Sequence, residues 1–494
     1  MTANQAVGSR SQGLNDGNFD PETVLAAANR GRFAKVSRPS EAEARRSEAA
    51  ATKRVKIRLT LMSLQVCPNR GLLSDGSRAS DGAEPFLDFG MTDVLDQIST
   101  AGNSPADRVR AHARLLSGQM RSLSAALFPP SASKGLRQFT SGEVAKTVGV
   151  SDGYLRQLSL DGLGPKPGSL PGGNRRLYTL AQVNELRGYL AEARPREALQ
   201  FKPGRRDSEK LQILTVANFK GGSAKTTTAL YLAQFLALRG FRVLAIDLDP
   251  QASLSAMFGY QPEFDIAENE TLYGSIRYDG ERRPMRDVVR PTYFEGISLV
   301  PGNLELMEFE HHTPRAMIER RARGHDLFFR RVATAIKEVA DDFDVVVVDC
   351  PPQLGYLTMG ALYAATGMLV TIHPQMVDVA SMSQFLLMTS DVMAVIEEGG
   401  GKLDYDFIRY VVTRHDPNDV PETQIVALLR NLFGEDVLRA TAWKSTAIAN
   451  AGLTKQSLYE LDRGSVGKGA YDRALESVDA VNTEIADLVK GVWR

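Results

Sequence analysis

The amino-acid sequence predicts an α/β protein in which a mostly parallel, helix-covered sheet follows a small α-rich domain. Strand patterns alternate with helical patterns through the second half of the 494 residues, and this alternation is typical of βαβ units. A Gly-rich, lysine-bearing loop lies between the first of these strands and a helix. Two further apolar strands end in aspartates. Together these observations predict a phosphate-binding sheet of the P-loop kind.

The predicted strands are short apolar runs rich in β-branched residues. They are Ile213–Ala217, Val243–Asp247, Ile297–Val300, Val345–Asp349, Met368–Ile372 and Phe407–Thr413. Helices are expected between them, for example over Asp326–Ala340 and Val377–Glu397. Because continuous β-branched runs indicate strands buried on both faces, we expect helices on both sides of the sheet.

The run Asn218–Thr228, N-F-K-G-G-S-A-K-T-T-T, predicts the phosphate-binding loop. Exposed backbone N–H groups at a helix start attract phosphate oxygens, and the helix dipole adds to the attraction. Lys225 would reach the terminal phosphates, and the Thr226 hydroxyl would ligate Mg²⁺. The expected nucleotide-binding residues are Lys220, Gly221, Gly222, Ser223, Ala224, Lys225, Thr226 and Thr227. The strict pattern G-x-x-x-x-G-K-[ST] fails at both glycines, where Phe219 and Ala224 stand.

Carboxylates follow two of the predicted strands. Asp247 and Asp249 lie at the end of one strand, and Asp349 ends another. The carboxyl ends of parallel strands form the edge at which open sheets bind ligands. A phosphate cradle beside such acids is the set that Mg-nucleotide chemistry requires.

Composition limits the remaining function classes. Lys plus Arg and Asp plus Glu both number 59, so any nucleic-acid surface must be a local patch. The two cysteines, Cys67 and Cys350, exclude a disulfide framework and favour a reducing cytoplasm. We expect no membrane-spanning run and no secretory leader.

Residues 1–90 are predicted to be a disordered extension, because apolar periodicity is weak there. Met91 begins a segment that reads like a protein start, which suggests that translation begins near it. A peptide from the first eighty residues in mass spectra of the natural protein would refute this. Residues 91–135 form a predicted helical arm. Its helix Ala106–Leu127 either packs on the next domain or serves in dimerisation.

Residues 136–194 predict a helix-turn-helix. Val144 and Val148 lie on one helical face, Gly149 makes the turn, and Ser151 caps the second helix. A Gly-rich turn then precedes a helix that Thr179 begins, and its two arginines suggest a wing. The expected DNA contacts are Tyr154, Arg156, Gln157, Arg175 and Arg176. The alternative is a small helical domain with a solvated basic face. A polar linker, 195–207, leads to the α/β domain, 208–494.

The loop Asn218–Thr228 resembles the deviant Walker A loop of ParA/MinD ATPases, usually written K-G-G-x-G-K-T. With Phe139–Leu158, Val243–Ser253 and Asp344–Gly355, it makes the chain from about Phe128 onward resemble the larger ParA plasmid-partition ATPases. Within them it is most similar to the RepA group of repABC plasmids. Residues 136–194 resemble the winged helix-turn-helix of MerR-like regulators.

The resemblance implies a homodimer that uses ATP and Mg²⁺. Lys220 would cross the dimer interface to the partner's nucleotide, Lys225 would bind phosphates in its own site, and Asp249 would orient the attacking water. Thr226, Asp247 and Asp349 would hold or support the metal ion. These few groups fit a slow ATPase, because phosphoryl transfer depends mainly on positioning and charge neutralisation.

Ala224 departs from the family pattern. Glycine there permits a positive φ, whereas alanine costs roughly 1–2 kcal/mol. Either the loop avoids that conformation or it tolerates the strain. We expect nucleotide binding to persist and hydrolysis to be slow, the alternative being that Ala224 has no effect.

The implied function is plasmid partitioning in the cytoplasm, on the nucleoid. ATP would create a nonspecific DNA surface, a ParB-type (RepB) partner would stimulate hydrolysis, and the winged helix would repress the protein's own operon. Arg414, Lys444 and Lys455 lie where relatives place nonspecific DNA contacts. The helix Asp472–Trp493 has an acidic polar side, so we expect it to cover the core rather than bind a membrane.

Two other functions were considered. A nucleotide-sensing repressor without a transport role is the first. A reductase or ligase like the nitrogenase iron protein is the second, but two distant cysteines cannot provide cluster ligands.

Overall fold

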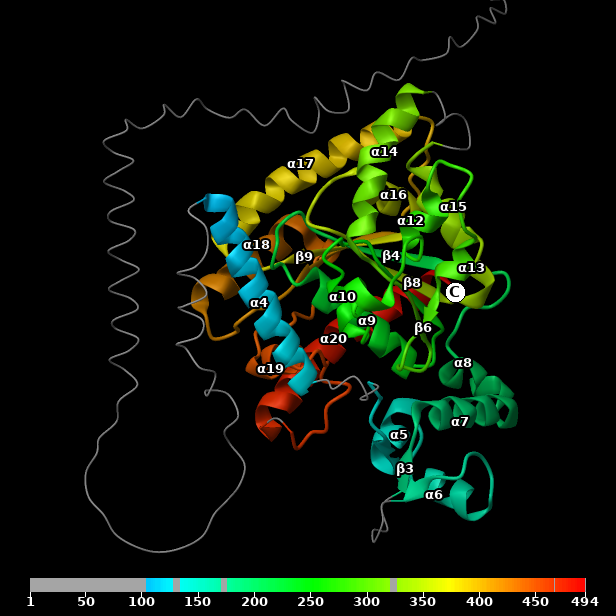
Figure 1. The fold of residues 1–494 in the computed structure, drawn as a ribbon. Helices are drawn as coiled ribbons and strands as arrows, with labels where there is room; N and C mark the ends of the chain where they lie inside the picture. Colours follow the sequence, from blue (N-terminus) through cyan, green and yellow to red (C-terminus); the bar gives the residue numbers. More distant parts are fainter. Residues whose placement is uncertain (1–103, 128–133, 170–175, 320–326, 466, 494) are drawn as a thin grey trace, which may run out of the picture. The chain divides into compact units, whose positions relative to one another are not determined.

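The computed structural model (Figure 1) describes residues 104–127, 134–169, 176–319, 327–465 and 467–493. The predicted extension 1–90, the start near Met91 and the wing residue Arg175 lie outside these residues. The chain divides into two compact units, 30–131 and a larger one that includes 132–494.

The described part of the smaller unit is the helix α4, Pro105–Leu127, which confirms the expected helix. Val109 and Leu116 of its apolar stripe are exposed. The choice between packing and dimerisation therefore stays open.

The larger unit contains a seven-stranded sheet in the order β10-β9-β4-β8-β5-β7-β6. Its strands are β4 (Gln212–Ala217), β5 (Val243–Asp247), β6 (Arg290–Pro291), β7 (Ile297–Val300), β8 (Val345–Asp349), β9 (Gly367–Ile372) and β10 (Phe407–Val412). All neighbours are parallel except β6 and β7. The predicted mostly parallel sheet is confirmed. The two-residue edge strand β6 was missed because it carries no apolar run.

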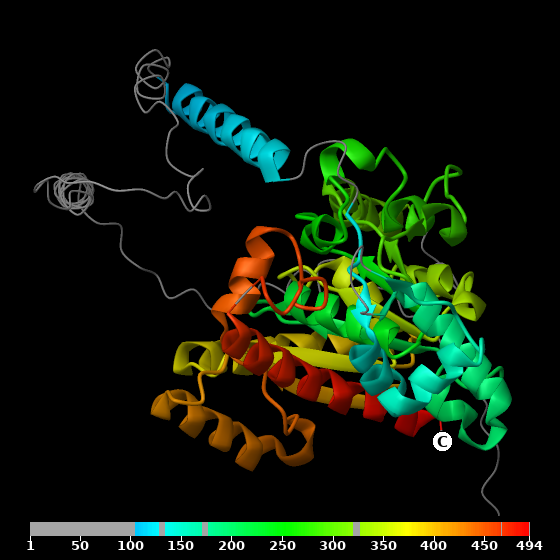
Figure 2. The ribbon, with the colours of Figure 1, turned by 90° about the horizontal axis from the view of Figure 1, so that it is seen from below.

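Helices cover both faces of the sheet. The helices α9 (Lys225–Leu238) and α20 (Lys468–Val492) lie against each other (Figure 2) and share a core with Leu214 and Val216 of β4. Ile213 points to the other core, which α12 (Leu272–Ile276), α14 (Met307–Ile318), α15 (Arg330–Lys337) and α16 (Tyr356–Ala364) build. Adjacent β4 residues therefore face opposite cores, as strand geometry requires. The last helix covers the core as expected.

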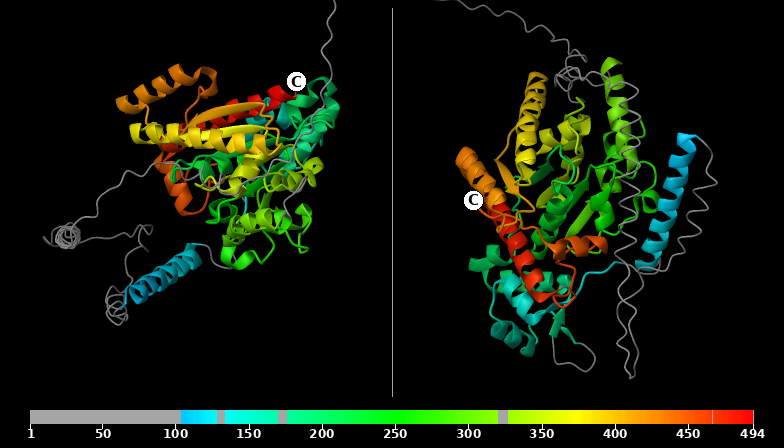
Figure 3. Two further views of the ribbon diagram at one scale, coloured as in Figure 1. Left: turned by 90° about the horizontal axis from the view of Figure 1, so that it is seen from above. Right: turned by 90° about the vertical axis from the view of Figure 1, so that its left-hand side faces the viewer.

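Two helices differ from their predicted bounds. The helix α15 is shorter than the predicted Asp326–Ala340, and a 3₁₀ turn, η4, covers Ala340–Asp342. The helix α17, Met376–Glu398, is drawn in yellow in both views of Figure 3. By its length and composition it is long and apolar enough to cross a membrane. This corrects the expectation that no run reaches that length. Met382, Phe385 and Ile396 of α17 nevertheless pack into the core beside β9.

The region before the α/β sheet has the predicted helices and turn. The helix α5 (Ser141–Val148) begins with a capping box at Thr140 and ends at Gly149, where φ is 81°. The helix α6 (Asp152–Leu160) is capped by Ser151, as expected. The short strands β1 (Phe139–Thr140), β2 (Gly168–Ser169) and β3 (Arg176–Tyr178) form an antiparallel sheet, and α7 covers Leu180–Ala193. Its identity as a winged DNA-binding domain stays a prediction.

The predicted linker, residues 195–207, is structured and packs against the rest of the larger unit. It contains the turn η1 (Pro195–Glu197) and the helix α8 (Ala198–Phe201), in which Phe201 is fully buried. Arg205 Nη2 also donates to the Ala340 carbonyl at 2.6 Å. One large apolar side chain is enough to dock a segment whose composition is otherwise polar.

A part-buried cation, Lys134, and a buried one, Arg187, join residues 134–201 to the α/β sheet region. Arg187 of α7 donates from Nη2 to the Leu238 carbonyl at the end of α9, at 2.7 Å. The Lys134 Nζ lies 2.8 Å from Glu460 Oε1 and also donates to the Met257 carbonyl. Because buried charges need partners, these contacts fix how the segment meets the sheet.

Candidate functional site

The predicted phosphate loop connects β4 to α9 and is held by neighbouring strands. Asn218 Nδ2 donates to the Thr371 carbonyl at 2.6 Å, and Thr413 Oγ1 donates to the Ser223 carbonyl at 3.1 Å. The Thr371 hydroxyl also bonds the Ser223 hydroxyl, at 3.1 Å. Hydrogen bonds from residues at the ends of β9 and β10 therefore hold the loop in place.

Ala224 adopts the left-handed conformation, with φ 66° and ψ 29°. The alternative in which the loop avoids that conformation is therefore wrong, and the alanine carries a cost of roughly 1–2 kcal/mol. Gly222 also has a positive φ, of 78°. Around Gly221 and Gly222, no atom of the described residues lies within 4 Å of where a Cβ would stand. The cradle is therefore open to a ligand.

Lys225 is the first residue of α9, and its side chain turns back over the loop. Its Nζ donates to the Lys220 carbonyl at 3.2 Å, and the residue is only 7% exposed. Burial lowers its pKa, while the negative charges of Asp349 and Asp249 oppose that shift. The loop thus presents a partly desolvated cation that an anionic group would stabilise.

Asp349 lies next to Asp247, because their strands pair in register at these residues. Asp349 is fully buried, and neither carboxylate oxygen has a hydrogen-bond partner in the described parts of the chain. Burial, and then the charge of Asp247, raises its pKa well above the usual value, while the Thr226 hydroxyl and Lys225 oppose the rise. A buried carboxylate without a partner beside a threonine hydroxyl fits a Mg²⁺ ion.

Asp247 is better satisfied than Asp349. Its Oδ2 accepts from the Ser255 amide and hydroxyl at 2.8 and 2.7 Å, and its Oδ1 accepts from the Asp249 amide at 3.2 Å. Burial raises its pKa to about 6, and the Ser255 hydrogen bonds oppose the rise. Asp249 is part-buried at the same edge, and its Oδ1 accepts from the Gln251 amide. Ser255 was missed because nothing in its local pattern links it to the acids.

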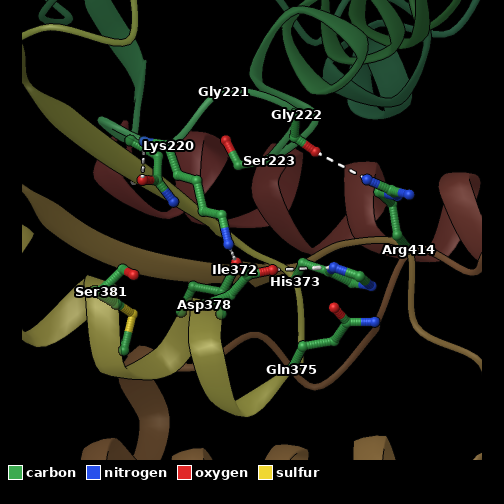
Figure 4. A pocket seen from close by; sticks show the side chains of 12 residues that line it. Lys220, Gly221, Gly222, Ser223, Ile372, His373, Gln375, Asp378, Ser381 and Arg414 are labelled. Carbon is green, nitrogen blue, oxygen red and sulfur yellow. Dashed lines mark hydrogen bonds and ion pairs between the residues drawn. The ribbon is translucent and has the colours of Figure 1, made fainter. Parts of the chain in front are cut away.

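Lys220 points across a cavity of about 260 Å³ beside the loop (Figure 4). Its ammonium group pairs with Asp378 of α17, and Asp378 Oδ2 also bonds His373 Nδ1 at 3.1 Å. Glu422 approaches the other ring nitrogen of His373, at 3.6 Å. Asp378 was not among the predicted site residues, because it lies inside the predicted helix Val377–Glu397 and no local pattern links it to the loop.

A second cavity, of about 350 Å³, is lined in part by the first residues of α9. Its lining includes Ala224, Thr227, Tyr231, Trp443 and Ile448, so its wall is mainly apolar. It is contiguous with the loop through Ala224. Apolar clefts with a few polar groups are the usual sites for flat organic ligands.

Two predicted DNA contacts lie at this cavity rather than apart from the loop. Arg414 Nη1 donates to the Gly222 carbonyl at 3.1 Å, and Lys444 lines the same wall. Lys455 lies elsewhere, where its carbonyl accepts from Lys134 Nζ at 2.6 Å.

The predicted contacts of the helix-turn-helix segment lie on its surface. Arg156 and Gln157 of α6 are exposed, and Gln157 Nε2 donates to Asp161 Oδ1 at 2.8 Å. Tyr154 lies under the guanidinium of Arg194, 4.4 Å from its ring centre. Arg176 Nη1 donates to the Arg156 carbonyl at 3.3 Å. These residues share one region, but nothing in the structure shows what they bind.

The chain is similar to several known proteins. Residues 211–398 match a family model described as "AAA domain". A Rhizobium rhizogenes protein named "Putative replication protein A" is 51% identical over 382 residues, which cover 77% of this chain and 94% of that relative. Protein SopA of Escherichia coli K12 is 29% identical over 372 residues, covering 74% and 92%. A solved structure titled "Partition Protein" shares the fold, with a TM-score of 0.54, 18% identity and coverage of 78% and 98%.

Proposed function

Because this chain belongs to the ParA family of partition ATPases, in the group of the rhizobial replication proteins A, we propose that it binds and slowly hydrolyses ATP with Mg²⁺ to segregate plasmid DNA. The observation that carries the proposal is the buried Asp349 carboxylate without a hydrogen-bond partner in the described residues. This carboxylate lies beside Thr226 and Lys225, the first two residues of the helix α9 that follows the phosphate loop.

Each residue of the site has a proposed role that follows from the chemistry of its side chain or backbone. Lys225 neutralises phosphate charge, and the backbone N–H groups around Gly222 hold phosphate oxygens. Thr226 and Asp349 would hold Mg²⁺, which supplies charge neutralisation and orientation of the phosphates. Asp247 supports that carboxylate, and Asp249 orients the attacking water.

The adenosine part occupies the 350 Å³ cavity beside Ala224 and Thr227. Trp443 lines that cavity and is 39% exposed, whereas the other tryptophan, Trp493, is buried. ATP binding should therefore quench or shift the emission of Trp443. Replacing Trp443 with Phe should remove most of that change, while Trp493→Phe should keep it.

Lys220 crosses to a second copy of the chain when the ATP-bound dimer forms. In the single chain it pairs with Asp378, so dimerisation requires this ion pair to open. The exchange of an intramolecular carboxylate for an intermolecular phosphate makes dimer formation depend on the nucleotide.

The partners of the dimer are DNA and a second protein. Nonspecific nucleoid DNA contacts Arg414, Lys444 and Lys455, and a ParB-type (RepB) centromere-binding protein stimulates hydrolysis. Residues 136–194 bind the operator of the protein's own operon through Tyr154, Arg156, Gln157, Arg175 and Arg176.

Retention on nonspecific DNA tests the proposal. The full chain should stay on immobilised DNA in the presence of Mg-ATP and leave it with ADP. The variant Lys225→Ala should lose this ATP-dependent retention, and Lys402→Ala, which changes an exposed lysine that lines neither cavity, should keep it. Retention that survives Lys225→Ala unchanged would overturn the proposal.

A second candidate function is a nucleotide-sensing repressor without transport. The exposed Arg156 and Gln157 on α6 favour it. Footprinting with ADP and with ATP separates the two functions. A promoter footprint without ATP-dependent coating of the flanking DNA supports the repressor.

A further inference from the structure

A third cavity, of about 450 Å³, is lined by residues of α12, α15 and α16 and of the loop after α12. These three helices lie close together (Figure 1). Its lining residues are Ser275, Arg282, Arg330, Arg331, Ala333, Thr334, Lys337 and Tyr363. None of them lines the two cavities at the phosphate loop. Four of these side chains are cationic, and no acidic residue is among the described residues that line the cavity.

Backbone carbonyls help to orient two of the guanidinium groups that line the cavity. Arg331 Nη1 donates to the Arg277 carbonyl at 2.7 Å, and its guanidinium stacks 4.2 Å from the ring centre of Tyr278. Arg330 Nη2 donates to the Gly400 carbonyl at 2.7 Å.

One carboxylate compensates part of this charge. Glu338 pairs with Arg282 and also accepts from the Met285 amide at 2.8 Å. Arg282 Nε donates in addition to the Ser275 carbonyl, at 2.7 Å. Arg330 and Lys337 have no carboxylate partner among the described residues, so positive charge remains at this cavity in a chain whose formal net charge is zero. Like charges held together repel each other unless an anion joins them.

Two buried polar atoms at the cavity lack partners in the described part of the chain. They are the hydroxyl of Ser275, a residue that is 1% exposed, and Nε of Arg330. Buried donors without partners are uncommon in folded proteins and call for a ligand or a water. A hydroxyl and guanidinium donors that line one cavity match the acceptor oxygens of a phosphate group.

From this arrangement we propose that the cavity binds a phosphate-bearing anion. A solvated basic face would explain exposed charges but not a buried hydroxyl without a partner. The anion is either a free phosphorylated molecule or a phosphodiester of the DNA backbone, since both present the same oxygens. The site goes beyond the ATP site proposed above, because it shares no lining residue with it.

Calorimetry with pyrophosphate tests the site on the full chain. The parent is Lys225→Ala, which weakens phosphate binding at the loop, so the result does not depend on the proposed ATP function. Adding Arg330→Gln or Lys337→Gln should weaken pyrophosphate binding about tenfold. Ser275→Ala removes only the hydroxyl and should weaken binding by a smaller factor. The matched control, Arg286→Gln, changes an exposed arginine outside the lining and should leave binding unchanged.

A parallel arm identifies the source of the phosphate. Binding of a labelled nonspecific DNA duplex is followed by fluorescence anisotropy without nucleotide, over a range of salt concentrations. If the cavity holds a DNA phosphate, Lys337→Gln should lower the slope of log affinity against log salt by about one. Weaker binding in the pyrophosphate arm alone supports a free phosphorylated ligand. Unchanged affinity in both arms, for cavity variants that melt like the parent, would overturn the proposal.

Discussion

The phosphate-loop edge and the helix-turn-helix segment present their functional side chains in opposite ways. At the loop, Asn218, Ser223 and Lys225 are buried, and strands distant in the sequence hold them in place. On α6, Arg156 and Gln157 are exposed. Chemistry at the loop is therefore preorganised by the sheet. Recognition by α6 depends on a partner that completes the contacts, and the two regions should respond differently to substitution.

The variant Lys225→Ala should produce the largest difference between the two regions, because it should change ATP turnover at the loop and not DNA binding by the helix-turn-helix segment. Lys225→Ala should lower ATP turnover about 100-fold or more, because it removes the ammonium group that neutralises phosphate charge at the loop. Binding of the chain to the DNA upstream of its own gene, without nucleotide, should not change. Turnover assays and gel shifts measure the two effects. A parallel loss of both would mean that the regions are not independent.

Among the substitutions considered, one at the junction between the regions should lower the free energy of unfolding most. Lys134→Met would leave Glu460 buried without its cation, at a cost of about 3 kcal/mol in the free energy of unfolding. The double variant Lys134→Met, Glu460→Gln should recover part of that cost. Denaturant titration measures both. A change below about 0.5 kcal/mol for the single variant would show that the pair does not hold the junction.

Asp349→Asn should have effects of opposite sign on stability and on function. It removes a buried charge without a hydrogen-bond partner in the described residues, so the ligand-free protein should gain about 1–3 kcal/mol. Stabilisation by Mg-ATP should disappear, because the proposed metal ligand is gone. Thermal melting with and without Mg-ATP measures both effects. A destabilised ligand-free variant would contradict this view of the site.

A substitution on α6 should have no effect on the loop. Arg156→Ala should weaken binding to the upstream DNA by about 1–3 kcal/mol if this exposed side chain reads a base. ATP turnover and the melting temperature should stay the same. Anisotropy with specific and scrambled duplexes measures the loss. Equal weakening on both duplexes would assign Arg156 to the DNA backbone instead.

Ala224→Gly should have the smallest effect. Glycine relieves the left-handed strain, which amounts to roughly 1 kcal/mol, although its freedom in the unfolded chain offsets part of the gain. We expect ATP affinity to persist and turnover to rise. Unchanged turnover would show that the strain at this residue does not limit hydrolysis.

Most of the phosphate-loop site was predictable from the sequence, because each of its parts is a short continuous segment of the chain. A strand end, a Gly-rich loop and a helix start follow each other along the chain, and Asp349 ends a strand of its own. Parallel sheets gather such strand ends at one edge, so their meeting was expected.

Other parts depend on contacts between distant segments. The pairing of Lys220 with Asp378 joins the loop to α17, and Ser255 reaches Asp247 from beyond a turn. Arg414 meets the loop only because β10 ends beside it. Phe201 docks a segment that composition alone marks as a linker. Sequence patterns report local periodicity, and none of these contacts has a local signal.

The most direct test of the account is a calorimetric titration of Mg-ATP into the purified full-length chain. We predict binding heat that requires Mg²⁺ and that Asp349→Asn strongly reduces, because Lys225, Thr226 and Asp349 together form the site. The absence of binding heat with both magnesium and ATP present would contradict the assignment of this edge as a nucleotide site.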